Sequence, residues 1–370
     1  MKSKGILTIA LSVLGSSFVL GQGQAPPLPP APANLPTPSL QATNDPGYAA
    51  VIAKCQTPPP AQGARGGGGA RGGAGAGAAP PQLPRDYTVT EIPRVIAAGQ
   101  RWKFVWQEAG NNGDGIVGTS DGGLLIAQND NSQVVKLDKS GTASVVYSGT
   151  HTGGALSMSP KGGLFVAERG LHATIVELAP QHKVLAESYQ GDPMDCIGGV
   201  LNDLTADSKG GAYFTMGGLY YASPKGVVTK YGANLGTNGI ILSANEKILY
   251  VTNGMTLAAF DVQPDGSLTN QREFAHLDGG GNGDGSTIDA AGRIYVTTNA
   301  GVQVISPEGK YLGIIPTPRS VISVAFGGKD KSTLFVLARG AKDASGNEVA
   351  NAAQVYTIQM IAQGYKGRAK

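Results

Sequence analysis

The tetrapeptide Asn-Gly-Asp-Gly occurs twice in this chain, as residues 112–115 and again as residues 282–285. Each copy opens the same pattern, which is a short apolar run, a polar turn and a second apolar run. The turn is residues 120–123 in the first copy and residues 289–292 in the second. Further units of this kind begin at Gly154, Asn202, Asn238 and Val324. Apolar runs that flank such turns predict β-hairpins, so the chain is predicted to be a repeat protein.

The spacing of the six hairpins indicates which repeat fold they build. They recur at intervals of roughly 35 to 50 residues, which is the length of one four-stranded propeller blade. A sustained helical period is absent from these segments, so we predict an all-β chain. The expected fold is a six-bladed β-propeller over residues 87–365. Residues 102–106 and 354–358 are expected to complete shared blades and so to protect the sheet edges.

The first residues have the composition of an export signal. Lys2 and Lys4 give a basic start, residues 6–20 are an apolar core, and Val19 with Gly21 offers a small-residue cleavage site. We therefore expect residues 1–21 to be a signal peptide and the protein to be exported, to the periplasm or the extracellular space. No other run approaches the ~20 apolar residues that a membrane span needs, so no span is expected.

Residues 22–86 are rich in Pro, Ala and Gly. Such a segment buries too little apolar surface to offset its ordering entropy, so we expect a disordered or semi-extended tether. It could be a spacer or a binding segment, and a chain that begins at Tyr87 should melt at nearly the full-length temperature. The two cysteines are Cys55 in this segment and Cys196 in the propeller. They could pair in an oxidising compartment or remain two separate thiols.

The charge pattern bears on the kind of partner. The net charge of +3 is small, and basic residues are scattered rather than clustered on a predicted strand. Nucleic acid is therefore not an expected partner.

Four polar residues occupy equivalent places in four of the repeats. In a propeller the first strand of each blade lines the central channel, so residues at its start converge on one channel mouth. The residues concerned are Asp114, Asn202, Asn238 and Asp284. Carboxylate and amide oxygens are the ligands expected for Ca²⁺ or Mg²⁺ rather than for a dedicated zinc site. Each residue taken singly is also an ordinary turn residue, because Asn and Asp tolerate positive φ.

The second strand of each blade returns to the same rim, which brings Arg169 there. His151 precedes the second inner strand and could carry protons at the rim, or it could simply be exposed. Residues 118–122 fit the pattern of a nucleophile elbow, Gly-x-Ser-x-Gly. That motif requires a strand-to-helix turn, whereas a hairpin turn is predicted here.

The chain resembles the senescence-marker-protein/gluconolactonase family, which includes the regucalcin-like propellers. The stretches that carry the resemblance are residues 201–204, 237–240 and 283–296. In that family one divalent metal is bound at the channel mouth by a glutamate, two asparagines and an aspartate. The resemblance implies that Asp114, Asn202, Asn238 and Asp284 are the metal ligands, that Asp284 is also the catalytic base, and that Asp203 orients them.

Two departures from the family pattern bear on this assignment. Asp114 stands where many members have a glutamate, so the ligand is shorter by one methylene. Val200-Leu201 stands where lactonase members often carry Arg-Pro, so an expected substrate-binding guanidinium is missing, and Arg169 or Arg319 could replace it.

The resemblance implies an exported, metal-dependent hydrolase that opens a lactone or a related cyclic ester. The expected cofactor is one divalent ion, Ca²⁺ first, with Mg²⁺ or Zn²⁺ as alternatives, and the expected partner is a small-molecule substrate. The alternative is a non-catalytic propeller that binds a ligand or a protein through the same rim.

Overall fold

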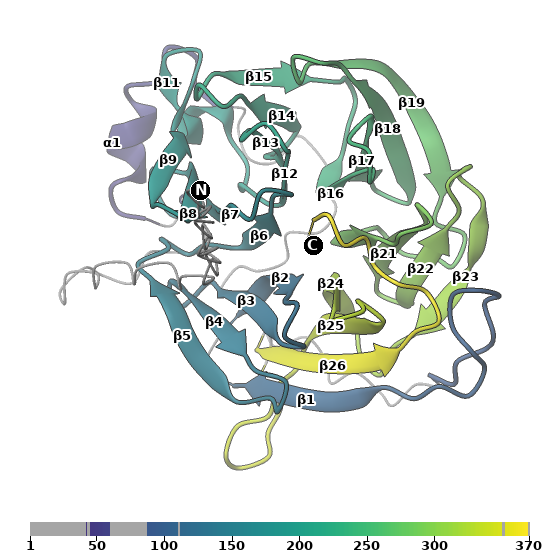
Figure 1. The fold of residues 1–370 in the computed structure, drawn as a ribbon. Helices are drawn as coiled ribbons and strands as arrows, with labels where there is room; N and C mark the ends of the chain where they lie inside the picture. The colour runs from purple at the N-terminus through teal and green to yellow at the C-terminus, as the bar shows by residue number, and fades with distance from the viewer. Residues whose placement is uncertain (1–41, 43–44, 60–86, 110–111, 350–351, 369–370) are drawn as a thin grey trace, which may run out of the picture.

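The computed structural model of the chain describes residues 42, 45–59, 87–109, 112–349 and 352–368. Within them, six four-stranded antiparallel sheets are arranged as the blades of a ring around a central axis (Figure 1). The fold is the six-bladed β-propeller predicted from the repeats. The signal-peptide prediction for residues 1–21 lies outside the described residues.

Five blades are each formed by four strands that follow one another in the chain. Blade 1 contains β2 (Gly113–Gly118), β3 (Leu124–Gln128), β4 (Gln133–Leu137) and β5 (Ala143–Ser148), and blade 2 contains β6 (Ala155–Met158), β7 (Leu164–Glu168), β8 (Thr174–Ala179) and β9 (Lys183–Ala186). Blade 3 contains β12 (Leu204–Ala206), β13 (Ala212–Thr215), β14 (Leu219–Ala222) and β15 (Val228–Tyr231). Blade 4 contains β16 (Thr237–Leu242), β17 (Ile248–Asn253), β18 (Thr256–Val262) and β19 (Leu268–His276), and blade 5 contains β20 (Ser286–Ile288), β21 (Ile294–Thr298), β22 (Gly301–Ile305) and β23 (Tyr311–Pro316).

Blade 6 closes the ring with strands from both ends of the domain. It contains β24 (Val321–Gly327), β25 (Thr333–Arg339), β26 (Ala353–Gln359) and, outermost, β1 (Lys103–Glu108). Strand β1 pairs antiparallel with β26, with Phe104 opposite Tyr356. The expected shared blade is therefore confirmed, and β1 covers the edge of β26 that would otherwise be open.

The six hairpins predicted from the sequence are the first two strands of the six blades. The first strands contact one another around the axis, and β2 contacts β24 to complete the circle. Residues 119–123 form the turn between β2 and β3, so the Gly-x-Ser-x-Gly pattern lies in a hairpin turn as expected.

The apolar core lies between the blades. Six buried clusters each join two neighbouring blades, and Ile116 of blade 1 packs with Phe335 of blade 6 in one of them. The second strand of a blade is packed on both faces, which is why β3 and β7 are mostly apolar and are buried along their whole length. The outermost strand β5 is mostly exposed. This packing holds the starts of the inner strands in fixed positions relative to one another.

Part of the segment expected to be a tether is packed against the propeller. Residues Tyr48–Ile52 form the short helix α1, and Cys55 forms a disulfide with Cys196, with Cα atoms 5.7 Å apart. Cys196 lies in a 3₁₀ turn, η2 (Met194–Ile197), which follows the small hairpin of β10 (Ser188–Tyr189) and β11 (Asp192–Pro193). The backbone N–H of Gln56 donates to the Asp192 carboxylate at 2.9 Å. The prediction of a disordered or semi-extended tether is therefore wrong for residues 45–59, because the disulfide and this hydrogen bond fix them to the segment that connects blade 2 to blade 3. The rest of residues 22–86, apart from Ala42, lies outside the described residues.

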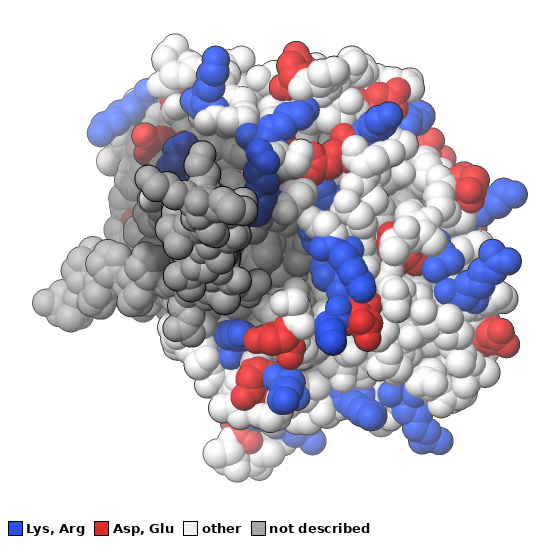
Figure 2. All heavy atoms as spheres, in the orientation of Figure 1, with Lys and Arg blue, Asp and Glu red and all other residues white. Residues whose placement is uncertain are grey.

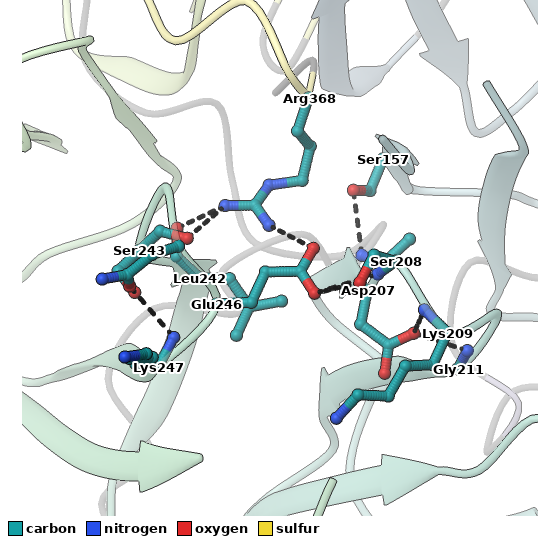
Figure 3. Close-up of polar contacts among 12 residues, drawn as sticks. Ser157, Asp207, Ser208, Lys209, Gly211, Leu242, Ser243, Glu246, Lys247 and Arg368 are labelled. Atoms are coloured by element: carbon teal, nitrogen blue, oxygen red, sulfur yellow. Dashed lines mark hydrogen bonds and ion pairs between the residues drawn. The ribbon is translucent and has the colours of Figure 1, made fainter. Parts of the chain in front are cut away.

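The C-terminal segment crosses the propeller at the far end of the inner strands. Tyr365 donates its backbone N–H to the Ile288 carbonyl, and Lys331 donates its Nζ to the Arg368 carbonyl at 2.9 Å. The Arg368 side chain is buried and reaches the Leu242 and Ser243 carbonyls, with Glu246 beside it at 3.4 Å (Figure 3). Because Leu242 ends β16, Arg368 marks the channel end opposite the start of that strand.

Figure 2, drawn in the orientation of Figure 1, shows basic and acidic side chains interspersed over the described part of the face in view. Among the described residues, no helix combines the length and the apolar character that crossing a membrane requires.

Candidate functional site

The four predicted ligands lie at the starts of inner strands on four blades. Asp114 is the second residue of β2, and Asn238 is the second residue of β16. Asn202 and Asp284 each stand two residues before their strands, β12 and β20. Their backbones are fixed by the neighbouring second strands, since Asn202 donates its N–H to the Thr215 carbonyl at 2.8 Å and Asp284 to the Thr297 carbonyl at 2.9 Å. The structure therefore brings the predicted set to one rim.

The side chain of Arg169 lies among these residues. Its Nη1 forms an ion pair with Asp114 Oδ2, and its Nη2 donates to the backbone carbonyl of Asn202 and, at 3.3 Å, to Asn202 Oδ1. The Asn202 Nδ2 in turn donates to Asn238 Oδ1 at 2.7 Å. A single chain of contacts thus connects three of the four predicted ligands through one guanidinium.

Space for this guanidinium is provided by Gly154. A Cβ atom on Gly154 would lie 1.8 Å from Arg169 Cζ, so the glycine leaves the volume that the guanidinium fills. Gly154 directly precedes β6, which is the place that a predicted ligand occupies in blades 1, 3, 4 and 5. Arg169, which directly follows β7, is only 6% exposed. Its Nε is buried without a hydrogen-bond partner.

The carboxyl group of Asp284 has a strongly raised pKa. Burial against the protein and the nearby carboxylates of Asp114 and Asp203 raise the pKa of Asp284 to about 8, against the opposing effect of Arg339 and Arg169. The side chain is enclosed at the channel mouth but keeps some exposure to solvent. A carboxyl group with a pKa near neutrality can both accept and release a proton under ordinary conditions.

Asp203 holds the neighbouring strands together behind the rim. It is buried, and its carboxylate accepts the backbone N–H of Leu204 at 2.8 Å and that of Ile240 at 3.0 Å. Thr215 adds a second link, because its hydroxyl donates to the Asn238 carbonyl at 2.6 Å. Asp203 thereby fixes blade 3 to blade 4 at the point where Asn202 and Asn238 meet.

Two other predicted residues are placed differently. The His151 side chain is exposed, while its backbone carbonyl accepts the N–H groups of Arg169 and Gly170, both at 3.1 Å. His151 therefore positions Arg169 through its backbone. Arg319 forms an ion pair with Glu348 at 2.8 Å, whereas Arg169 forms its ion pair with Asp114.

The donor chemistry fits a hard divalent cation. Two carboxylates and two side-chain amides offer oxygen ligands, which Ca²⁺ and Mg²⁺ prefer. Among the described residues, no group of three or more His, Cys, Asp and Glu side chains is arranged to hold a metal ion. A cation site on this rim would therefore use the amides of Asn202 and Asn238 as well as the two carboxylates.

Sequence reasoning missed two features of the site. It placed Arg169 on the rim but not between the ligands, and it gave Gly154 no role. The available signal was the glycine itself, which stands where four of the other repeats carry a carboxylate or an amide. Arg339, which donates to Asn112 Oδ1 at 2.9 Å, also acts electrostatically on Asp284.

Comparison with known proteins gives a family and several relatives. A sequence model of the SMP-30/gluconolactonase/LRE-like region matches residues 143–339. A gluconolactonase of Zymomonas mobilis is 27% identical over 217 residues, which are 50% of this chain and 60% of that protein. A lactonase of Staphylococcus aureus is 32% identical over 142 residues, which are 35% of this chain and 36% of that protein. The matches therefore span less than two thirds of either relative.

Solved structures share the fold at low sequence identity. A gluconolactonase from Xanthomonas campestris superposes with a TM-score of 0.59 at 21% identity, covering 76% of this chain and 98% of its own. A calcium-binding protein, regucalcin, from Agrobacterium tumefaciens superposes with a TM-score of 0.57 at 19% identity, covering 72% of this chain and 98% of its own.

Proposed function

The chain belongs to the SMP-30/gluconolactonase/LRE-like family, and on this premise we propose that it is an exported, divalent-cation-dependent hydrolase of lactones or related cyclic esters. The observation that carries the proposal is the meeting of Asp114, Asn202 and Asn238 at one channel mouth, with the perturbed carboxyl group of Asp284 in electrostatic contact. The gluconolactonase and lactonase relatives support the substrate class. A small, ring-closed ester is therefore the proposed substrate.

In this proposal Asp114, Asn202, Asn238 and Asp284 hold the cation. Ca²⁺ is the first candidate, because the donors are all oxygen and a structural neighbour is described as a calcium-binding protein. Mg²⁺ and Zn²⁺ remain the alternatives to test beside it. When bound, the ion supplies Lewis-acid polarisation of the ester carbonyl and favours the ionised form of Asp284.

The residues of the chain then carry out the proton transfers. The ionised Asp284 carboxylate accepts a proton from a water molecule, whose oxygen bonds to the ring carbonyl carbon. The bond between that carbon and the ring oxygen breaks, and Asp284 returns the proton to the departing oxygen. One water is consumed, and the product is the open hydroxy acid. Asp203 keeps Asn202 and Asn238 in place through its contacts with the two strands.

Export has two supports. One is the basic and apolar composition of residues 1–21. The other is the disulfide of Cys55 and Cys196, a bond that persists in oxidising compartments. Cell fractionation with identification of the N-terminal residue of the purified protein tests this part. Recovery in the cytoplasm with both thiols reduced contradicts it.

A lactone panel tests the activity. We expect the full chain to open at least one lactone faster than buffer that contains the same ion, and we expect a chelator to abolish the excess rate. Asp284→Asn removes the proposed base. Asp278→Asn is its matched control, since Asp278 is an exposed carboxylate a few residues earlier in the same loop. Asp278→Asn should keep the activity. If no lactone is opened in a chelator-sensitive way, the non-catalytic propeller that binds through the same rim is the better description.

A further inference from the structure

The guanidinium of Arg169 sits where the proposed site needs positive charge. Blades 1, 3, 4 and 5 each bring one oxygen donor to the rim. Blade 2 instead brings Gly154 and Arg169, whose guanidinium lies against Gly154. From blade 2, Arg169 reaches Asp114 on blade 1 and Asn202 on blade 3. It therefore contacts two donors that lie on opposite sides of its own blade.

These contacts occupy the donor atoms that a cation would use. Asp114 Oδ2 is paired with Nη1, and Asn202 Oδ1 accepts from Nη2 at 3.3 Å. Asn202 then donates its amide to Asn238 Oδ1 at 2.7 Å. Because one guanidinium heads this chain of contacts, its removal would free Asp114 and Asn202 and allow the Asn202 amide to rotate away from Asn238.

The guanidinium is incompletely satisfied in this position. Its Nε is buried with no hydrogen-bond partner. Because a buried donor without a partner is costly, an ion pair with a purely structural role would be expected to satisfy all of its donors. Arg169 thus places one positive charge among oxygen atoms of the kind that also coordinate a divalent ion.

We propose that Arg169 is an internal competitor of the divalent cation, which fills the donor set while no ion is bound and must leave Asp114 and Asn202 before an ion can bind. This inference rests on the cation site of the proposed function and adds its regulation. Ion affinity is then reduced by the fraction of molecules in which the guanidinium is in place. Removing the guanidinium from the site should raise the affinity for the cation.

Two substitutions remove the guanidinium in different ways. Arg169→Gln deletes the charge. Gly154→Ala keeps the charge but places a methyl group 1.8 Å from the present position of Arg169 Cζ, and the flexible end of that side chain can move aside. Gly218→Ala is the matched control, because its Cβ would meet nothing closer than 3.4 Å. Gly218 lies at the turn after β13, on the same rim.

Calorimetric titration of the full chain with Ca²⁺ alone, after treatment with a chelator, measures the competition. We expect Arg169→Gln and Gly154→Ala to bind Ca²⁺ on the order of tenfold more tightly than the wild type, as expected if about 1.4 kcal/mol is needed to displace the guanidinium. Gly218→Ala should bind as the wild type does. Near-ultraviolet circular dichroism checks that each variant is folded, and Arg169→Lys, which cannot bridge both partners with a planar fork, should bind with intermediate affinity.

The possible results separate the two proposals. Equal affinity in the wild type, Arg169→Gln and Gly154→Ala would overturn the competition and leave the cation site standing. Weaker binding in Arg169→Gln would also overturn it, because Arg169 would then support the site. No Ca²⁺ binding by any of these proteins would overturn both proposals. The NMR signal of the Arg169 Nε–H group in the wild type gives an independent readout, which must shift as Ca²⁺ is added if the guanidinium is released.

Discussion

Asp284 is the residue on which the proposed chemistry depends, and its environment has a consequence for stability. In the folded chain its pKa is raised from 3.8 to about 8 by burial and by the charge of Asp114 and Asp203. Between these two values the folded state binds the Asp284 proton while the unfolded state does not. The contribution of this group to the free energy of unfolding therefore falls as pH rises from 3.8 to about 8.

Replacing Asp284 by Asn removes this decrease in the free energy of unfolding with rising pH. In the presence of a chelator, Asp284→Asn should melt at a higher temperature than the wild type, by a margin that grows as the pH rises from about 5 to about 9. A stabilisation of a few kcal/mol at the alkaline end is the rough expectation, since each pKa unit corresponds to about 1.4 kcal/mol. Melting curves of both proteins across this range make the test. Asp278→Asn serves as control, and parallel curves for Asp284→Asn and the wild type would show that the carboxyl group is not perturbed.

At this scale the sequence predicted which residues meet but not what lies between them. Asp114, Asn202, Asn238 and Asp284 share a place in the repeat, so their convergence follows from the hairpin pattern alone. The position of Arg169 depends on the reach of a long side chain across two neighbouring blades. The alternation of side chains along one strand carries no information about a contact between blades. In the sequence, only Gly154 indicated space for the Arg169 side chain.

At the scale of elements, the hairpins were the most predictable part of the structure. Each strand pair carries its own signal in consecutive residues, namely β-branched and aromatic runs around a Gly or Asp turn. The outer strands β5 and β19 were not predicted, because they are largely exposed, and β19 also lacks the apolar run of the more buried strands. The pairing of Cys55 with Cys196 was left open, because these residues are separated by 141 positions and no local pattern connects them.

The disulfide predicts a stability effect outside the blades. Cys55→Ser should lower the free energy of unfolding by about 2–4 kcal/mol, because the cross-link restricts a long loop of the unfolded chain. Denaturant titration under non-reducing conditions measures this, and Cys196→Ser should behave in the same way.

A chain that begins at Tyr87 provides the companion experiment. The composition of residues 22–86 led us to expect a melting temperature close to that of the full-length protein. Since that chain lacks Cys55 and α1, it should instead melt cooperatively but at a lower temperature, like Cys55→Ser. Melting at the full-length temperature in both proteins would mean that the disulfide and α1 add nothing to stability.

On the scale of the whole molecule, the two ends of the propeller channel differ. One end carries the oxygen donors and Arg169, and at the other the C-terminal segment runs across the ends of the inner strands. Its last described residue, Arg368, buries its guanidinium against blade 4, with Glu246 beside it (Figure 3). The segment thus ties blade 6, from which it emerges, to blades 5 and 4.

Removal of the Arg368 guanidinium should destabilise the propeller. Arg368→Ala is expected to lower the free energy of unfolding by about 2–4 kcal/mol, because the buried Leu242 carbonyl and the Glu246 carboxylate lose their partner. Lys366→Ala, an exposed residue of the same segment, should change stability by less than about 0.5 kcal/mol. Urea titration of the three proteins makes the comparison. If Arg368→Ala matched Lys366→Ala, the C-terminal segment would be attached by its backbone contacts alone.

The central claim is that Asp284 both holds the cation and accepts the proton from water. The most direct test measures Ca²⁺ affinity and lactone turnover together for the wild type and Asp284→Asn, with turnover compared at equal ion occupancy. The Asn side chain keeps an oxygen ligand but cannot act as a base, so turnover should fall by roughly 100-fold or more, further than Ca²⁺ affinity falls. Turnover equal to that of the wild type at equal ion occupancy would contradict the assignment of Asp284 as the base.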